Sequence, residues 1–272
     1  MEQIKELFEK NKYVKVENFL DKGIAQFLYE YMLTREATYE WMLHKRLIVN
    51  QIKAPYLFGQ YEPDNDMGYQ GAFTLYADPA METLLGGMTN VIGSLVGLTL
   101  DPTYSFCRIY KKDHELKPHK DRPACEISAT VCLGYEENTP WSINMQNEES
   151  ETVTTVSMKQ GDAVIYRGCD VVHGRDPYAG KQQGQVFLHY NDMNGPHYNK
   201  EEGGMPKSQF QAVRDGSSRF DNRECLGVLK PEQTRDLIEQ LSNADFRDRN
   251  PPKGLFTNHI KPSIPWEKLT EE

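Results

Sequence analysis

The stretch between residues 104 and 191 constrains the fold most, because its apolar residues recur with a period of two. Runs rich in β-branched and aromatic residues alternate there with polar turns, which is typical of half-buried strands. The runs are Tyr104–Tyr110, Lys117–His119, Ile127–Tyr135, Trp141–Met145, Thr152–Val156, Asp162–Tyr166, Val171–His173 and Gln185–Tyr190. About eight strands in so short a stretch leave no room for crossover helices, so we expect a jelly-roll sandwich or small barrel.

The longest of these runs also predicts which residues share a face. Successive side chains of a strand point to opposite sides of the sheet. One face is predicted to hold Ile127, Ala129, Val131, Leu133 and Tyr135, and the other Ser128, Thr130 and Cys132.

The flanking regions divide the chain into three parts of one compact unit. Residues 1–100 are predicted to be a helical support, with a short strand over Tyr13–Leu20, Asp21 capping a helix that runs to about Arg35, and a second helix over Met81–Leu98. Residues 101–193 form the β core. Residues 194–272 begin with a polar, Gly-rich loop to Ser218, a candidate lid, and continue into a predicted helix from Lys230.

Composition narrows the partners and the compartment. The 272 residues include 31 Lys and Arg against 40 Asp and Glu, a net charge of −9, which disfavours nucleic acid as a partner. No apolar stretch is long enough to cross a bilayer, and the N-terminus does not resemble a signal peptide. Five cysteines without a C-x-x-C pair indicate no disulfide framework. We therefore expect a cytoplasmic protein without a membrane partner.

Three residues predict a metal centre. His119 and Asp121 are two positions apart at the end of a predicted strand, so their side chains point to the same side. His173, in a later short strand, can supply a third ligand. Two His and one carboxylate form the facial triad of non-haem Fe(II) sites, which leaves coordination positions open. The alternative is that the two histidines are unrelated surface residues, since one His-x-acid pair is expected by chance.

Around this triad the sequence resembles the Fe(II)/2-oxoglutarate-dependent dioxygenases, in particular the prolyl 4-hydroxylase-like branch. The segments that carry the resemblance are Arg108–Tyr110, Leu116–Arg122, Ile127–Tyr135, Gly161–Tyr166, His173–Arg175 and Gln185–Tyr190. The resemblance implies a double-stranded β-helix core, cupin-like, with His119, Asp121 and His173 as iron ligands. It also implies 2-oxoglutarate as co-substrate, O₂, and ascorbate as an accessory cofactor.

The chain departs from the family where the distal carboxylate of 2-oxoglutarate is bound. Family members carry a Lys or Arg about ten residues beyond the second His, because a dicarboxylate in a dry pocket needs a cation. Here that stretch reads Lys181-Gln-Gln-Gly-Gln185. Arg175, two residues after His173, is the first substitute, although it can instead pair with Asp176 or Asp170. The other candidate contacts to 2-oxoglutarate are Arg122, Lys181, Gln185, Tyr110 and Tyr135.

The predicted function is hydroxylation of a small-molecule or peptidyl substrate, amino-acid-like and with prolyl included, with release of succinate and CO₂. A second interpretation is a cupin-like metalloenzyme that does not use 2-oxoglutarate, favoured by the missing Lys or Arg near Gln183. A third is a non-catalytic β-sandwich that binds a partner. The 194–272 region leaves room for a homodimer contact.

Overall fold

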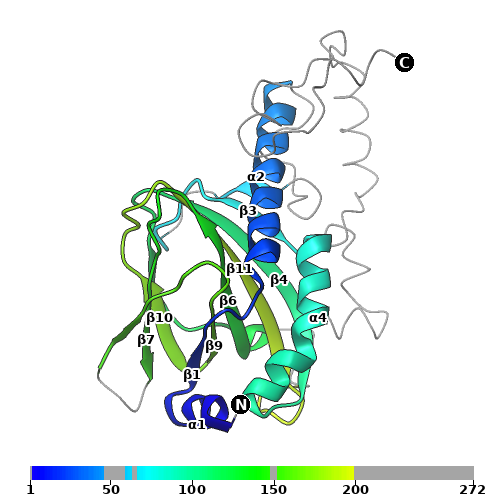
Figure 1. The fold of residues 1–272 in the computed structure, drawn as a ribbon, viewed down its shortest axis with the longest axis vertical. Coiled ribbons are helices and arrows are strands. Elements are labelled where there is room, and N and C mark those ends of the chain that lie inside the picture. Colours follow the sequence, from blue (N-terminus) through cyan, green and yellow to red (C-terminus); the bar gives the residue numbers. More distant parts are fainter. Residues whose placement is uncertain (1, 46–58, 63–65, 148–151, 199–272) are drawn as a thin grey trace.

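The structure is a computed structural model, and it describes residues 2–45, 59–62, 66–147 and 152–198. The predicted helix from Lys230, the tail that follows it, Cys225 and most of the candidate lid lie outside the described residues. The described part is built from two antiparallel sheets with helices on one side (Figure 1).

The larger sheet has seven strands in the order β1-β9-β6-β11-β4-β3-β2. Its strands are β1 (Tyr13–Val16), β2 (Gln60–Tyr61), β3 (Phe73–Tyr76), β4 (Leu100–Lys111), β6 (Ile127–Tyr135), β9 (Ala163–Arg167) and β11 (Gln182–Asp192). The smaller sheet, in the order β5-β10-β7-β8, consists of β5 (Leu116–His119), β7 (Ile143–Asn147), β8 (Thr154–Val156) and β10 (Val171–Arg175). The two sheets face each other, so the predicted jelly-roll core is confirmed.

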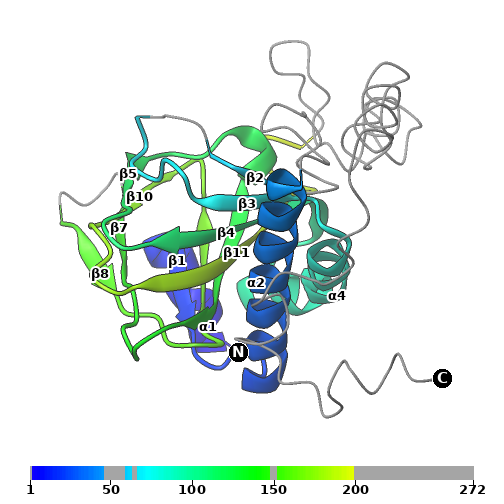
Figure 2. The same cartoon turned by 90° about the horizontal axis from the view of Figure 1, so that it is seen from above.

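In the part of the chain that the structure describes, three α-helices lie beside the larger sheet. They are α1 (Glu2–Asn11), α2 (Lys22–His44) and α4 (Pro79–Val96), and a short 3-10 helix, η1, spans Pro123–Cys125. Asp21 caps α2 as predicted, because its carboxylate accepts hydrogen bonds from the backbone N–H groups of Gly23 and Ile24 at 2.8 and 3.2 Å. The helix continues beyond Arg35 to His44. Figure 2 shows α2 and α4 along the outer side of the larger sheet, where they bury its apolar face.

The first hundred residues contribute strands as well as helices. β1 pairs with β9, from Tyr13 opposite Tyr166 to Val16 opposite Ala163. β3 pairs with β4, and β2 with β3, at the other edge of the sheet. The sequence predicted β1 but not β2 or β3, which are short. The N-terminal part therefore completes the larger sheet rather than only supporting it.

A β-bulge changes the predicted face of one site residue. Cys132 and Gly134 in β6 pair with consecutive residues of β11, so Leu133 is an extra residue. The bulge reverses the alternation, and Tyr135 packs with Cys132 between the two sheets. The prediction that Tyr135 shares a face with Ile127 is wrong for this reason, and the correction places Tyr135 inside the barrel.

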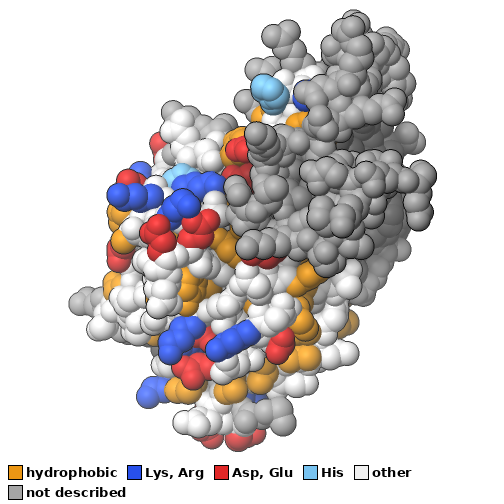
Figure 3. Space-filling view, turned by 45° about the horizontal axis from the view of Figure 1, so that its top comes forward, with side chains coloured by type: hydrophobic (Ala, Val, Ile, Leu, Met, Phe, Trp, Pro, Cys, Tyr) orange, Lys and Arg blue, Asp and Glu red, His pale blue; other side chains and the backbone are white. Residues whose placement is uncertain are grey.

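The helices, the surface charges and the cysteines relate to the predictions about membrane, nucleic acid and disulfides. Among the described residues no helix is long and apolar enough to span a membrane. On the face in Figure 3, Lys and Arg side chains lie in separate groups beside Asp and Glu. Cys107, Cys125 and Cys132 are buried and form no disulfide. The expectation that nucleic acid is not a partner stays a prediction.

Candidate metal centre

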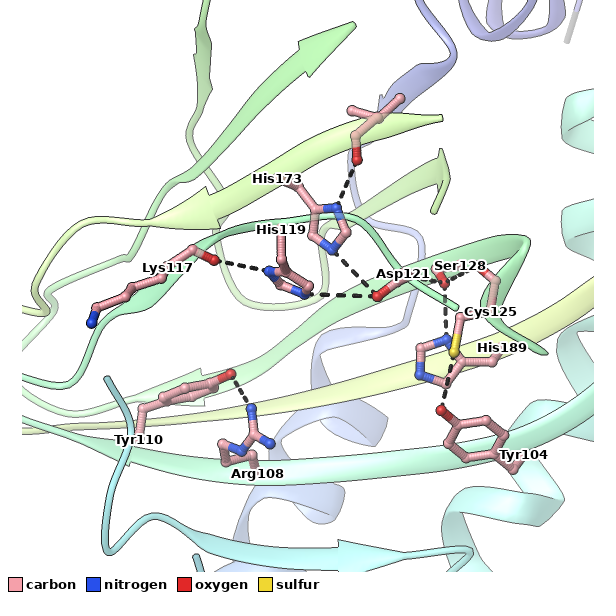
Figure 4. Close-up of polar contacts among 11 residues, drawn as sticks. Tyr104, Arg108, Tyr110, Lys117, His119, Asp121, Cys125, Ser128, His173 and His189 are labelled. Atoms are coloured by element: carbon pink, nitrogen blue, oxygen red, sulfur yellow. Dashed lines mark hydrogen bonds and ion pairs between the residues drawn. The ribbon is translucent and has the colours of Figure 1, made fainter. Parts of the chain in front are cut away.

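The predicted triad comes together between the two sheets (Figure 4). His119 and His173 are directly opposite each other in the antiparallel β5–β10 pair, with ring centroids 4.4 Å apart. Asp121 follows β5, and its Oδ1 lies 3.7 Å from His119 Nε2 and 3.6 Å from His173 Nε2. These separations exceed hydrogen-bond length but allow the three atoms to bind one ion.

Backbone carbonyls fix the tautomer of both histidines. His119 Nδ1 lies 2.9 Å from the Lys117 carbonyl oxygen, and His173 Nδ1 lies 3.0 Å from that of Val171. A carbonyl only accepts, so each Nδ1 carries the hydrogen and donates it, and each Nε2 keeps its lone pair directed toward Asp121. Burial lowers the pKa of His173 and favours the neutral form that a metal requires. The donor set therefore fits a divalent transition metal, and Fe(II) in particular.

The second oxygen of Asp121 is held by a polar chain. Ser128 Oγ lies 3.1 Å from Asp121 Oδ2, 3.0 Å from the Cys125 carbonyl oxygen and 2.9 Å from His189 Nδ1. Gly168 lets this loop pack closely, because a Cβ there would lie 2.8 Å from the Cβ of Asp121. Asp121 is thus oriented before any ion binds.

A cavity of about 270 Å³ opens onto the triad. The three ligands form part of its wall, and most of the remaining wall is aromatic. The other lining residues are Tyr69, Tyr76, Tyr104, Phe106, Arg108, Leu116, Cys125, Ile143, Tyr166, Phe187 and His189. The volume suits a small molecule or a single side chain of a larger one.

Arg175 is a buried cation without an acidic partner among the described residues. Its side chain is 3% exposed, its Nη1 donates to the carbonyl oxygens of Trp141 and Ser142 at 2.8 and 3.3 Å, and its Nε has no partner. The alternative of an ion pair with Asp176 or Asp170 is not what the structure shows. A buried, unpaired guanidinium is unfavourable unless an anion binds to it, so Arg175 fits the distal carboxylate of 2-oxoglutarate.

Other buried polar side chains inside the barrel also have unfilled hydrogen-bonding capacity. Gln183 Oε1 and Gln185 Nε2 are buried without partners, although Gln183 Nε2 approaches the Cys132 sulfur at 3.6 Å. Tyr110 lies inside the barrel, where its hydroxyl accepts a hydrogen bond from Arg108 at 2.8 Å. A dicarboxylate bound inside the barrel would give such donors and acceptors hydrogen-bond partners.

One predicted contact lies elsewhere, and that expectation is corrected. Lys181 has a 67% exposed side chain that pairs with Glu136 on the surface. Arg122 is exposed, with its guanidinium over the Tyr104 ring at 5.2 Å. Lys181 precedes β11 and its side chain points to the surface, whereas Arg122 packs on a residue of the cavity wall and stays a predicted contact.

The site residues predicted from the sequence did not include Arg108, Ser128 or His189. Arg108 lines the cavity from β4, and His189 lines it from β11. A signal was available for Arg108, because Phe106 and Tyr110 flank it two residues away on the same strand face. A charged residue between two inward-facing aromatic residues of a strand predicts a buried charged side chain with a functional role.

Fold and site together define a double-stranded β-helix with a two-His, one-carboxylate metal centre. No family model and no curated protein matches the sequence. A solved prolyl-4-hydroxylase from Pseudomonas putida has a TM-score of 0.53 at 15% identity, over 70% of this chain and 97% of that one. An oxidoreductase of the 2OG-Fe(II) oxygenase family from Burkholderia pseudomallei has a TM-score of 0.52 at 12% identity, over 70% and 90%.

A third solved structure is the non-haem α-ketoglutarate-dependent epimerase SnoN of nogalamycin biosynthesis. Its TM-score is 0.51 at 14% identity, over 70% of this chain and 82% of that one. The chain therefore has the fold of the 2OG-Fe(II) oxygenases, as the sequence resemblance predicts.

Proposed function

We propose that the protein is an Fe(II)- and 2-oxoglutarate-dependent dioxygenase that oxidises a small molecule or a single side chain of a peptide. The observation that carries the proposal is the triad itself, with both Nδ1 atoms tied to carbonyls and both Nε2 atoms facing Asp121. Bound iron and 2-oxoglutarate would supply oxidation by O₂, with succinate and CO₂ as by-products. The neighbours include hydroxylases and an epimerase by name, so hydroxylation is the outcome that we propose first.

The residues of this chain have separate tasks in that reaction. His119, Asp121 and His173 hold the metal on one side and leave the cavity side open. Arg175 binds the distal carboxylate of 2-oxoglutarate, and its position on β10 replaces the cation that relatives carry near Gln183. Free thiols in the described part support a reducing compartment, in keeping with a cytoplasmic location.

The test is an anaerobic titration of the purified full-length protein with Fe(II) and then 2-oxoglutarate, followed by the visible charge-transfer band of the chelate. We expect the band in wild type, its loss in Asp121→Ala and its weakening in Arg175→Gln. Lys181→Gln is the matched control, because it removes one surface cation and leaves the barrel unchanged. Circular dichroism checks that each variant is folded.

Other results would contradict the proposal in different ways. Iron binding without a band would favour the cupin-like enzyme that does not use 2-oxoglutarate. The absence of iron binding would favour a non-catalytic β-sandwich. An equal band in wild type and Arg175→Gln would leave the dioxygenase assignment but remove Arg175 as the anchor.

A further inference from the structure

A second buried arginine lies in the wall of the cavity. Arg108 is 7% exposed, and its side chain extends from β4 while the triad occupies the opposite wall (Figure 4). Arg175 does not line this cavity; its guanidinium lies over the Trp141 ring, which packs against Tyr110, the hydrogen-bond partner of Arg108. The barrel therefore holds two separate cations, of which the proposed co-substrate occupies one.

Arg108 is held rigidly, and its hydrogen bonds are incomplete. Its guanidinium carbon lies 3.6 Å from the centre of the Tyr69 ring and 4.9 Å from that of Phe106. Nη1 donates to the Tyr110 hydroxyl at 2.8 Å and Nη2 forms an ion pair with Glu62 at 3.5 Å, whereas buried Nε has no partner. A permanently charged group in this state can still donate to an incoming anion.

The cavity walls indicate the rest of the ligand. The rings of Tyr76 and Tyr104 are stacked with centroids 4.8 Å apart, and aromatic side chains supply most of the surface between Arg108 and the triad. Such walls favour a flat apolar group. The guanidinium fork matches the two oxygens of a carboxylate, and the volume of about 270 Å³ limits the ligand to a small molecule.

The local charge of the chain supports an anionic ligand. Residues 108–122, which include β5 and the turn before it, contain six Lys or Arg and three Asp or Glu. The whole chain has a net charge of −9. A basic segment beside the cavity of an acidic protein raises the local concentration of anions.

We propose that Arg108 binds the carboxylate of the primary substrate, a small monocarboxylic acid whose ring-containing body lies between the aromatic walls. That the acid is a substrate rests on the proposed function. Its binding to Arg108 does not, because the binding site needs neither iron nor oxygen. It places the end of the acid remote from Arg108 beside the triad.

The test is isothermal calorimetry with 3-phenylpropionate and its neutral analogue 3-phenylpropionamide. Both are titrated into the full-length protein, metal-free and loaded anaerobically with Fe(II) and 2-oxoglutarate. In wild type we expect the acid to bind roughly ten- to a hundredfold more tightly than the amide. Arg108→Gln should remove that preference, and Arg108→Lys should retain part of it because charge remains without the fork. Lys112→Gln, an exposed cation on the same segment, should behave as wild type.

Each alternative result has a distinct meaning. Equal affinity of wild type for acid and amide, or no binding of the acid, would overturn the inference. A preserved preference in Arg108→Gln would do the same. Loss of 2-oxoglutarate binding in Arg108→Gln with Arg175→Gln unaffected would make Arg108 the co-substrate anchor instead. If wild type prefers the acid but never binds 2-oxoglutarate, the proposed function fails while the Arg108 site stands.

Discussion

The two faces of the seven-stranded sheet are both buried, but by different chemistry. On the helix side, β6 and β11 present Ile127, Ala129, Val131, Val186 and Leu188 to one apolar core. On the barrel side the same strands present Ser128, Thr130, Gln183, Gln185 and His189, all buried. Period-two alternation thus divides each strand between a dry core and a polar interior.

The helix-side face provides stability, and the barrel-side face provides the groups that can bind a ligand. The helix-side face gains free energy from apolar burial, and alternative side chains there must match its volume. The barrel-side face keeps Arg108 Nε, Arg175 Nε, Gln183 Oε1 and Gln185 Nε2 buried without partners. Such atoms lower the free energy of unfolding unless a ligand forms hydrogen bonds with them. The barrel-side face is therefore suited to binding rather than to stability.

The largest effect should come from removing volume on the helix side. Leu188→Ala deletes a fully buried side chain from the apolar core and should lower the free energy of unfolding by about 2–5 kcal/mol. Urea denaturation measures the change, and an Fe(II) titration of the folded protein should be unaffected. Loss of iron affinity in this variant would show that the two faces are not independent.

A second effect should come from a histidine on the barrel side. Burial lowers the pKa of His189 to about 4, and Asp121, Arg122 and His173 are the charged or titratable groups near it. The unfolded chain takes up this proton near pH 6.5, so stability is complete above that pH and falls as the pH drops toward 4. The slope is up to ~1.4 kcal/mol per pH unit.

Metal-free wild type and His189→Asn should therefore diverge in urea denaturation between pH 6.5 and 4. The variant should lose less stability over this interval, because asparagine does not titrate. His173, whose pKa is also lowered, contributes equally to both proteins. Parallel curves would mean that His189 has the same pKa in the folded and the unfolded protein.

A smaller effect is expected for the group that orients the carboxylate ligand. Ser128→Ala removes the hydroxyl beside Asp121 Oδ2 and should weaken Fe(II) binding about 10- to 100-fold. Competition with a chelator measures the affinity. Thr130→Ala is the control, since that hydroxyl donates to Gln185 at 3.2 Å and not to a ligand of the metal. Equal losses in both variants would point to a general disturbance of β6.

The smallest effect should distinguish the faces at neighbouring positions. Gln185→Leu combined with Thr130→Val removes the unpartnered Nε2 together with the hydroxyl that donates to the same amide, and should raise the free energy of unfolding by about 1 kcal/mol, with weaker binding of 2-oxoglutarate. Val186→Thr places a hydroxyl in the dry core and should lower it by roughly 1–3 kcal/mol. Thermal denaturation compares them, and changes of the same sign would contradict the contrast between the faces.

Much of this architecture could be predicted from the sequence, because strand alternation and helix caps are local. The β6 run matches its predicted bounds, Ile127–Tyr135, and α4 begins two residues before the predicted Met81. The His119–Asp121 spacing follows from the geometry of one strand. The prediction that His173 is the third metal ligand depended on strand placement and on the resemblance to a family.

Other features could not be predicted, because they depend on which residues of other strands lie opposite them. The bulge at Leu133 arises from the register with β11, and it reverses the side of Tyr135. The choice of Arg175 over Lys181 follows from burial of one and exposure of the other. The short strands β2 and β3 gain their stability by pairing at a sheet edge rather than from propensity.

The sequence by itself determined the elements and two of the metal ligands, since both depend on neighbours within a few residues. Only the tertiary structure decided that His173 lies opposite His119, because that contact closes a loop of more than fifty residues through sheet register. It also decided that Arg108 and Arg175 stand as separate buried cations. Whether a buried charged group forms an ion pair depends on side chains of strands that are distant in the sequence. The local sequence pattern does not predict which strands those are.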